Sequence, residues 1–226
     1  MSSGPNAPAT AAWTTPGYAA SWSAADGLAG LLSLPWRMTA ALVGLQRPPG
    51  LVLDVGSGPG TFLDELLTCF PDAQGIWLDA SEDMLESARR TLARHGERVS
   101  YVVADAAEFA TLDLPAGIDV ITNSRVAHHF ELSGLRAFYR QAAERLAPGG
   151  WLVTLDHIRP TDEWDSRFRT VLPAFAGSNA GKPTHPHYFP FPTVDDHLAA
   201  LTAAGFDEVE MPWRAFYTCL FVGHRH

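Results

Sequence analysis

Residues 51–60 carry the clearest sign of ligand chemistry in the chain. They read LVLDVGSGPG, a short apolar run followed by closely spaced glycines. A glycine-rich turn between a strand and a helix lets a ligand approach the backbone closely. The spacing departs from the dinucleotide fingerprint G-x-G-x-x-G, because Gly60 comes one residue early and Thr61 stands where that pattern has glycine. On this segment alone, a tight strand-to-helix turn without a ligand remains an alternative.

Polar side chains recur at the ends of later apolar runs. Asp54, Asp79, Asp105, Asn123 and Asp156 each lie in or directly after such a run. The carboxyl ends of parallel strands meet at one edge of an open sheet, and ligands bind there. We therefore expect these residues to gather at one edge, although Asp79 could also be a plain helix cap and Asp105 a plain turn residue.

Two adjacent histidines, His128 and His129, follow the fourth apolar run. An imidazole at the ligand-binding edge can act as a general base near neutral pH. We expect His128 to face a substrate and His129 to be a buried, hydrogen-bonded structural residue. The alternative is that neither ring takes part in proton transfer.

A second histidine pair, His185 and His187, lies in the segment THPHYFPF. Together with His128 or His129 it could bind a metal ion, but surface or packing roles are the expectation, and no metal is predicted. Large aromatic residues are dense in the same region and near the N-terminus, which favours an apolar or aromatic small molecule as ligand, or else ordinary packing. They are Trp22, Trp164, Phe168, Phe175, Tyr188 and Phe189.

The elements that must position these residues alternate along the chain. Strands are expected at 51–55, 75–78, 99–103, 118–122 and 151–155, and helices at 61–70, 81–95, 132–146, 162–175 and 195–204. Such alternation implies a parallel sheet with helices on both faces. The strands expected at 206–211 and 215–222 are too close for a helical crossover and should pair as a hairpin. The fold class is thus α/β, a doubly wound Rossmann-like sheet of seven strands, mostly parallel with an antiparallel last strand.

The rest of the chain divides around this sheet. Residues 1–16 are small, polar and proline-containing and are expected to be disordered. Residues 17–226 form a single domain, in which 17–47 should be a helical lid interrupted near Pro35 and 157–192 an inserted substrate lid.

Composition narrows the function classes. The formal net charge is −9, and there is no run of Lys or Arg, so neither nucleic acid nor an anionic membrane surface is an expected partner. The two cysteines lie in apolar contexts and are expected to be buried and reduced. Neither a secretory signal nor an apolar run of the ~18 residues that a membrane span needs is visible. We expect a cytoplasmic protein, monomer or dimer.

The series of motifs resembles that of class I methyltransferases, which use S-adenosylmethionine (SAM). The glycine turn resembles their motif I, and the acids that end the second and third strands resemble their ribose- and adenine-binding acids. The segment NSRVAHHF resembles motif IV and the residues after it, and LAPGGWLV resembles the turn into the fifth strand. The resemblance extends from about Leu51 to Val222 apart from the lid.

The resemblance implies a SAM-binding role for particular residues. Gly56, Ser57, Gly58 and Gly60 would surround the ribose and methionine parts, and Asp54 and the Asn123 carbonyl would lie near the methionine ammonium. Asp79, with Ala80 beside it, would bind the ribose. Met84, Asp105 and the backbone of Ala106 would contact the adenine. From their position before the sheet, Tyr18 and Trp22 are expected to fold over the cofactor.

The function that this implies is methyl transfer to a small molecule, with oxygen expected as the accepting atom in preference to nitrogen or carbon. Two alternatives remain at this point. One is a protein that keeps SAM as a structural ligand and performs other chemistry, because fold does not determine function. The other is an NAD(P)-dependent oxidoreductase, against which the glycine spacing and Asp105 argue.

Overall fold

The computed structural model describes residues 15, 17, 29–176 and 190–226. The expectations for residues 1–14, for Tyr18 and Trp22, and for His185, His187, Tyr188 and Phe189 fall outside these residues. Within the described chain, no helix is long and apolar enough to cross a membrane.

A single seven-stranded sheet organises the molecule, with the strand order β3-β2-β1-β4-β5-β7-β6. The strands are β1 (Leu51–Val55), β2 (Gln74–Asp79), β3 (Val99–Val103), β4 (Ile118–Ser124), β5 (Leu146–His157), β6 (Glu208–Ala215) and β7 (Thr218–His224). The first five are parallel to one another, whereas β7 is antiparallel to both β5 and β6. The expected doubly wound fold with a closing hairpin is confirmed.

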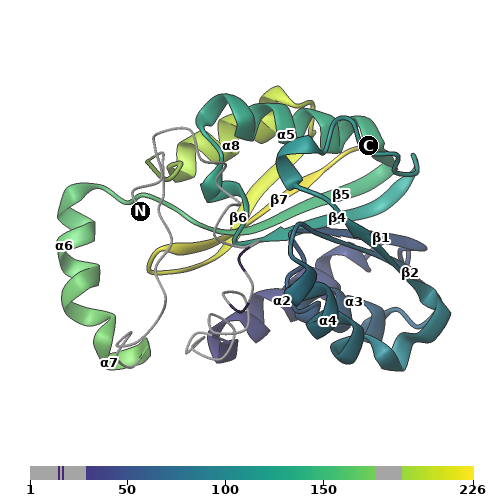
Figure 1. Cartoon of the computed structure of the whole chain (residues 1–226). Coiled ribbons are helices and arrows are strands. Elements are labelled where there is room, and N and C mark those ends of the chain that lie inside the picture. Colours follow the sequence, from purple (N-terminus) through teal and green to yellow (C-terminus); the bar gives the residue numbers. More distant parts are fainter. Residues whose placement is uncertain (1–14, 16, 18–28, 177–189) are drawn as a thin grey trace.

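Helices cover both faces of the sheet (Figure 1). On one face lie α2 (Ala29–Val43), α3 (Thr61–Cys69) and α4 (Glu82–Thr91). On the other lie α5 (Leu132–Arg145) and α8 (Val194–Ala203). Alternate residues of each strand enter the two cores: Val52 and Trp77 face the first, and Leu53 and Ile76 the second.

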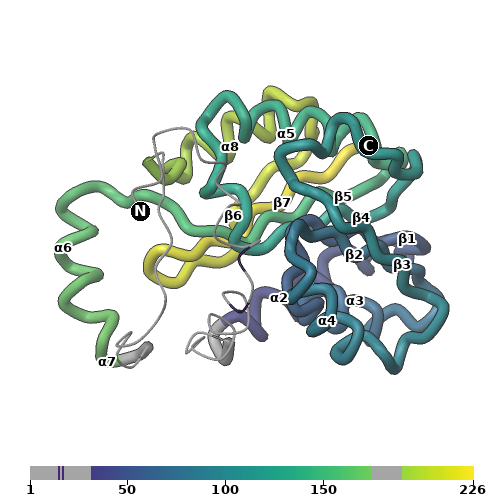
Figure 2. The backbone as a smooth tube through the Cα atoms, viewed as in Figure 1, coloured from purple at the N-terminus to yellow at the C-terminus, as the bar shows by residue number. Residues whose placement is uncertain are grey.

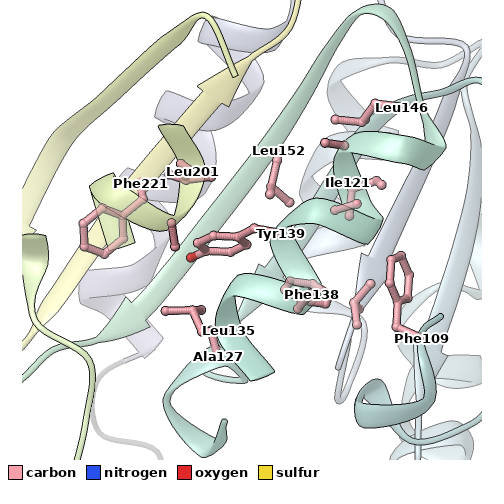
Figure 3. Packing of buried hydrophobic residues seen from close by; sticks show 14 of the residues in the cluster. Phe109, Ile121, Ala127, Leu135, Phe138, Tyr139, Leu146, Leu152, Leu201 and Phe221 are labelled. Atoms are coloured by element: carbon pink, nitrogen blue, oxygen red, sulfur yellow. The ribbon is translucent and has the colours of Figure 1, made fainter. Parts of the chain in front are cut away.

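The second core is built around the aromatic residues of α5 (Figure 3). Tyr139 packs between the sheet and α8, near Leu152 and Phe221, whereas Phe138 packs against Phe109 on the other side of α5. Because these large side chains are buried, the position of α5 relative to β4 and β5 is well determined. This matters for function, since the connection from β4 to α5 carries the candidate catalytic histidines.

The expected helix break near Pro35 is wrong, because α2 continues through this residue. Proline removes one backbone donor from a helix and costs ~3 kcal/mol in a helix interior. The apolar face of α2 offsets that cost, because Leu32, Trp36 and Val43 are buried against the first core and Trp36 stacks on Phe62 at 5.9 Å. The segment 29–43 is therefore part of the core, and a lid role for 17–47 stays a prediction.

The hairpin turn also differs from expectation, since β6 continues to Ala215 and the chain reverses at Phe216 and Tyr217. Pro212 marks a shift in strand register between Glu210 and Trp213, not a turn. Proline is tolerated there because β6 is an edge strand.

The segment after β5 leaves the sheet as α6 (Asp162–Val171) and α7 (Pro173–Ala176), which project beyond the sheet in the tube view (Figure 2). Its contacts are with the β6–β7 turn: the Tyr217 hydroxyl donates to Asp165 over 2.9 Å, and Phe168 packs edge-on against Phe216 and Tyr217. The single helix expected at 162–175 is instead two, divided at Leu172 before Pro173, and whether 157–192 covers a substrate stays a prediction.

The cysteines differ from one another. Cys219 is buried in β7, as expected, but Cys69 is exposed at the end of α3, so the expected burial of both is wrong. The reason is the helical period, which directs Leu66 and Leu67 into the core and leaves this position on the solvent side.

Candidate functional site

The glycine turn joins β1 to α3 at the carboxyl edge of the sheet. Gly56, Gly58 and Gly60 all have positive φ, at 64°, 54° and 80°. A Cβ on Gly56 would lie 2.2 Å from Cγ2 of Val126. Another residue at this position would therefore clash as well as being strained. The turn is held close to the end of β4, which supplies the next part of the site.

Asp54 lies beneath this turn and is completely buried. Its carboxylate accepts hydrogen bonds from Ser57 Oγ at 2.6 Å and from Thr122 Oγ1 at 2.7 Å. Burial raises the pKa of this carboxyl to about 6, against the hydroxyl donors that lower it. A buried carboxylate with this pKa is predominantly ionised at neutral pH and is available to a cationic group.

Asp79, at the end of β2, is joined directly to the same turn. Its Oδ2 accepts from the backbone N–H of Gly58 at 2.9 Å and its Oδ1 accepts from that of Ser81 at 3.0 Å. Desolvation raises the pKa of this carboxyl, and the nearby Asp105 charge adds to the shift. Each carboxylate oxygen retains acceptor capacity beyond these bonds.

The helix cap of α4 is Ser81, whose Oγ accepts from the backbone N–H of Met84. Asp79 is therefore not the capping residue of α4, which was the alternative to a ligand-binding role. Ala80 lies between these two residues, half-buried. Met84 is buried, and its sulfur would lie 3.8 Å from a Cβ on Gly58, so this side chain reaches the glycine turn.

Asp105 caps a short 3-10 helix, Ala106–Glu108, by accepting from the backbone N–H of Ala107 at 2.8 Å. The alternative role of Asp105 as a turn residue is therefore observed. Ala106 is half-buried at the start of this helix.

Asn123 is completely buried in β4, beside Val55 of β1 in the strand register. Its Nδ2 donates to Thr154 Oγ1 at 2.8 Å. Among the described residues its Oδ1 has no hydrogen-bond partner. A buried amide oxygen without a donor is costly, so this atom is a natural place for a ligand donor.

His128 and Asp156 form a buried pair across the ends of β4 and β5. The imidazole Nδ1 lies 2.5 Å from Asp156 Oδ1, and the backbone N–H of His128 donates to Oδ2 at 3.0 Å. A carboxylate can only accept, so Nδ1 carries a proton, and in the neutral ring Nε2 then carries the lone pair. Arg125, with a φ of 59°, turns the chain at the end of β4 and so directs the following segment back over β5.

The ring of His128 lies in an aromatic group. His129 is 4.1 Å away between ring centroids, His157 is 5.2 Å away, and Phe191 packs edge-on at 5.1 Å. His129 is half-buried, whereas His128 is the more buried of the two and is the one held by a carboxylate. The histidine held by a carboxylate is thus the first of the pair, whereas the sequence indicated the second as the hydrogen-bonded structural residue; which of the two faces a substrate stays a prediction.

Of the aromatic residues expected to form a ligand-binding cluster, Trp164 is exposed and Phe168 packs on the hairpin turn. For Phe168 the structure thus shows packing against the hairpin turn, the alternative to a ligand-binding role. The side chain of Phe175 lies outside the described residues.

Three residues of this edge were not assigned a role from the sequence: Thr122, which bonds Asp54, Asp156, which bonds His128, and His157 beside it. Only Asp156 carried a signal, since it follows an apolar run like the other acids. The sequence-predicted residues Asp54, Ser57, Gly58, Asp79 and Met84 come together around the glycine turn, and His128 lies at the neighbouring strand end.

Comparison with known proteins gives the family. Residues 52–150 match a family model described as a methyltransferase domain. A demethylmenaquinone methyltransferase from Thermus thermophilus is 31% identical over 186 residues, which cover 76% of this chain and 81% of that protein. A 3-amino-4-hydroxybenzoate 4-O-methyltransferase from Streptomyces cremeus is 33% identical over 109 residues, or 48% of this chain.

Among solved structures, a Nostoc punctiforme protein assigned to the O-methyltransferases superposes with a TM-score of 0.72 at 20% identity, covering 97% of this chain. This likeness shows a shared fold. The chain spans 63% of that protein and 29% of the Streptomyces relative. The fold, the glycine turn with its flanking acids, and the Thermus relative lead to one conclusion: the chain belongs to the class I SAM-dependent methyltransferases.

Proposed function

We propose that this protein transfers a methyl group from SAM to an oxygen nucleophile on an apolar or aromatic small molecule, with His128 as the general base. The observation that carries the proposal is the buried pair of His128 and Asp156 at the carboxyl edge of the sheet, with Nδ1 and Oδ1 2.5 Å apart. This pair fixes the tautomer in which Nε2 can accept a proton.

The glycine turn and its surroundings fit SAM. Gly58 has a positive φ and no side chain, and a Cβ placed on it would lie 3.8 Å from the Met84 sulfur. This leaves space for a ligand beside the Asp79 carboxylate. The buried Asp54 carboxylate suits a ligand that carries an ammonium, because it is anionic at neutral pH, and the Asp79 carboxylate beside the turn suits one that carries vicinal hydroxyls.

The residues that would hold SAM are those that the family resemblance implies. Asp79 would accept hydrogen bonds from the ribose hydroxyls, and Asp54 with Asn123 would lie at the methionine ammonium. Met84, Asp105 and Ala106 would contact the adenine. The remaining contacts would come from Gly56, Ser57, Gly58, Gly60 and Ala80, and from Tyr18 and Trp22 outside the described residues.

When bound, SAM supplies an electrophilic methyl group on a sulfonium. His128 would take the proton of the acceptor hydroxyl at Nε2 during methyl transfer, in which S-adenosylhomocysteine is the leaving group. Asp156 stabilises the resulting imidazolium through the Nδ1 hydrogen bond, and its second bond to the backbone N–H of His128 keeps the ring in place. Alignment of nucleophile and methyl group supplies a further share of the rate.

An aromatic acceptor fits the rings around His128. His157 and Phe191 stack nearly parallel, at 18° between planes and 6.3 Å between centroids, and flank the base. The Streptomyces relative is named for methylation of a hydroxyl on an aromatic ring. His129, also half-buried beside the base, would contribute to acceptor binding or to proton transfer.

The test is turnover by the His128→Ala variant. Release of S-adenosylhomocysteine is measured with a panel of small phenols that includes 3-amino-4-hydroxybenzoate, and SAM affinity is measured by calorimetry. We expect kcat to fall by about 10²–10⁴ with little change in SAM affinity. The matched control is His95→Ala, which also removes a buried histidine from a carboxylate, Asp64 at 2.7 Å, but away from this edge.

Two results would contradict the proposal. Full turnover by His128→Ala would leave proximity alone to explain catalysis. SAM binding by the wild-type protein without any release of S-adenosylhomocysteine would favour SAM as a structural ligand.

A further inference from the structure

A second cluster of ligand-type side chains lies at the opposite end of the sheet from His128. Glu208 begins β6, and His224 ends β7, with His226 following at the next position on the same face. In the β5–β7 ladder His157 pairs with Thr218, whereas His224 pairs with Trp151 at the other end of the ladder. The cluster is thus separate from the proposed methyl-transfer site by the length of these strands.

The ladder geometry brings the three side chains together. Glu208 and His224 are direct cross-strand partners, so their side chains leave the same face of the sheet. His226 is two residues beyond His224 and shares that face. One ligand atom from each residue lies within 4.8 Å of the others.

His224 is the unusual member because its ring is buried and, among the described residues, its nitrogens make no hydrogen bond. Its side chain is 1% exposed, and within the described part of the chain neither ring nitrogen has a hydrogen-bond partner. The ring lies against Trp151 at 4.3 Å between centroids and meets His226 edge-on at 4.7 Å. Leaving both nitrogens of a buried imidazole unsatisfied is costly, so a partner for this ring is expected.

The other two members face solvent and can complete a coordination site. Glu208 Oε2 lies 3.7 Å from His224 Nδ1, and Glu208 Oε1 lies 3.3 Å from His226 Nε2. In a tetrahedral zinc site with bonds of 2.0–2.2 Å, neighbouring ligand atoms are separated by ~3.4 Å. The Glu208–His226 pair already has this spacing. Side-chain shifts of ~1 Å would bring the ligand atoms of the other pairs to the same separation.

The backbone around the cluster is already held in place. The N–H of Asp207 donates to the carbonyl of His224 at 3.0 Å, and the N–H of His226 donates to the Asp207 carboxylate at 2.9 Å. Arg225, on the opposite face, donates to the carbonyl of Ala143 in α5. Ordered ligands lose little entropy on binding, which favours a metal ion here.

We propose that Glu208, His224 and His226 bind a Zn²⁺ ion that ties the edge strand β6 to the end of β7. Two imidazoles and one carboxylate are a ligand set that Zn²⁺ prefers and that Mg²⁺ and Ca²⁺ do not. Water occupies the fourth position. The ion satisfies the His224 imidazole and neutralises the Glu208 charge, and it acts on stability and not on methyl transfer.

The test is Zn²⁺ binding to the full chain freed of any histidine tag, followed by calorimetry and thermal unfolding. We expect one Zn²⁺ per chain and a rise in Tm with added Zn²⁺, with no response to Mg²⁺. The exposed variants Glu208→Gln and His226→Ala should each weaken Zn²⁺ binding at least ~10-fold. Glu210→Gln removes an exposed carboxylate two residues along the same strand and should bind as the wild type does.

A buried-site variant such as His224→Ala can fail to fold, so the two exposed variants carry the test. NMR adds a direct readout, because Zn²⁺ should shift the ring signals of His224 and His226 and leave those of His95 unchanged. Absence of Zn²⁺ binding by the wild-type chain, or wild-type affinity in either Glu208→Gln or His226→Ala, overturns the proposal.

Discussion

Replacement of Asp156 by asparagine tests whether this residue acts through His128. The Oδ1 atom accepts from the His128 ring and from the backbone N–H of His157 at 2.6 Å, and Oδ2 accepts from the backbone N–H of His128. An asparagine has one oxygen, so its NH₂ group must face a donor at one of the two positions. Either orientation therefore changes the pair in a way that can be calculated.

If the NH₂ group takes the Oδ2 position, the His128 backbone N–H loses its acceptor and the ring keeps its tautomer. The unsatisfied N–H costs about 1–3 kcal/mol of stability. The imidazolium then forms beside a neutral amide. Exchange of a charge-assisted hydrogen bond for a neutral one raises the barrier by about 1–2.5 kcal/mol, or roughly 5- to 70-fold in kcat.

If the NH₂ group takes the Oδ1 position, the ring proton must move from Nδ1 to Nε2, and the base is lost. Loss of the correct tautomer can cost about 10⁴ in rate. We therefore expect Asp156→Asn to lower kcat by about 5- to 10⁴-fold. The acidic limb of the pH–kcat profile should move to lower pH, because the carboxylate that favours the imidazolium is gone.

The assay is a double-mutant cycle that follows S-adenosylhomocysteine release by the wild type, Asp156→Asn, His128→Ala and the double variant. If Asp156 acts through His128, its substitution should change kcat by less than about twofold when His128 is already alanine. An equal loss of kcat in both backgrounds would refute the reasoning. Urea unfolding of each variant separates the stability cost from the catalytic one.

Three further predictions concern the SAM-binding edge. Asp79→Ala removes two charge-assisted hydrogen bonds of about 1.5–3 kcal/mol each, so the Kd for SAM should rise by about 10² or more, and unchanged affinity in calorimetry would contradict the ribose assignment. Burial raises the pKa of Asp54 to about 6, so protonation of this carboxylate should weaken SAM binding as the pH falls below that value, by about tenfold at one pH unit below it. A Kd for SAM that does not depend on pH would refute the ammonium contact, and so would the same pH dependence in Asp54→Asn. Gly56→Ala should lower the free energy of unfolding by about 1–3 kcal/mol more than Gly96→Ala does. Both glycines have positive φ, but only at Gly56 would the new Cβ meet a neighbour, Val126 Cγ2 at 2.2 Å. Equal losses of stability in denaturant unfolding would show that backbone strain alone is involved.

Local features of the fold can be predicted from the sequence because they depend on residues only a few positions apart. The strand Leu51–Val55, the glycine turn after it and the Ser81 cap of α4 are all recognisable from neighbouring residues. The sheet edge that gathers Asp54 and Asp79 also follows, because parallel strands place their carboxyl ends together. The family resemblance rests on the order of these local features.

Tertiary packing overrode the local signal at two proline residues. Pro35 reads as a helix breaker, yet the burial of Trp36 on the sheet keeps α2 continuous. The expected strands left residues 212–214 as the turn, yet β6 pairs with β7 through this segment and Pro212 lies at a register shift. Packing against α3 exceeds the local preference at Pro35, and pairing within the hairpin exceeds it at Pro212.

The pairs that carry chemistry were decided by tertiary structure alone. Thr122 donates to Asp54 from 68 residues away, and Asp156 meets His128 across 28 residues, because β4 lies between β1 and β5. The sequence by itself determined which residue types end each strand. Which strand becomes the neighbour of which, and so which carboxylate faces which imidazole or hydroxyl, depends on how the helices pack on the two faces of the sheet, and spacing along the chain does not encode that.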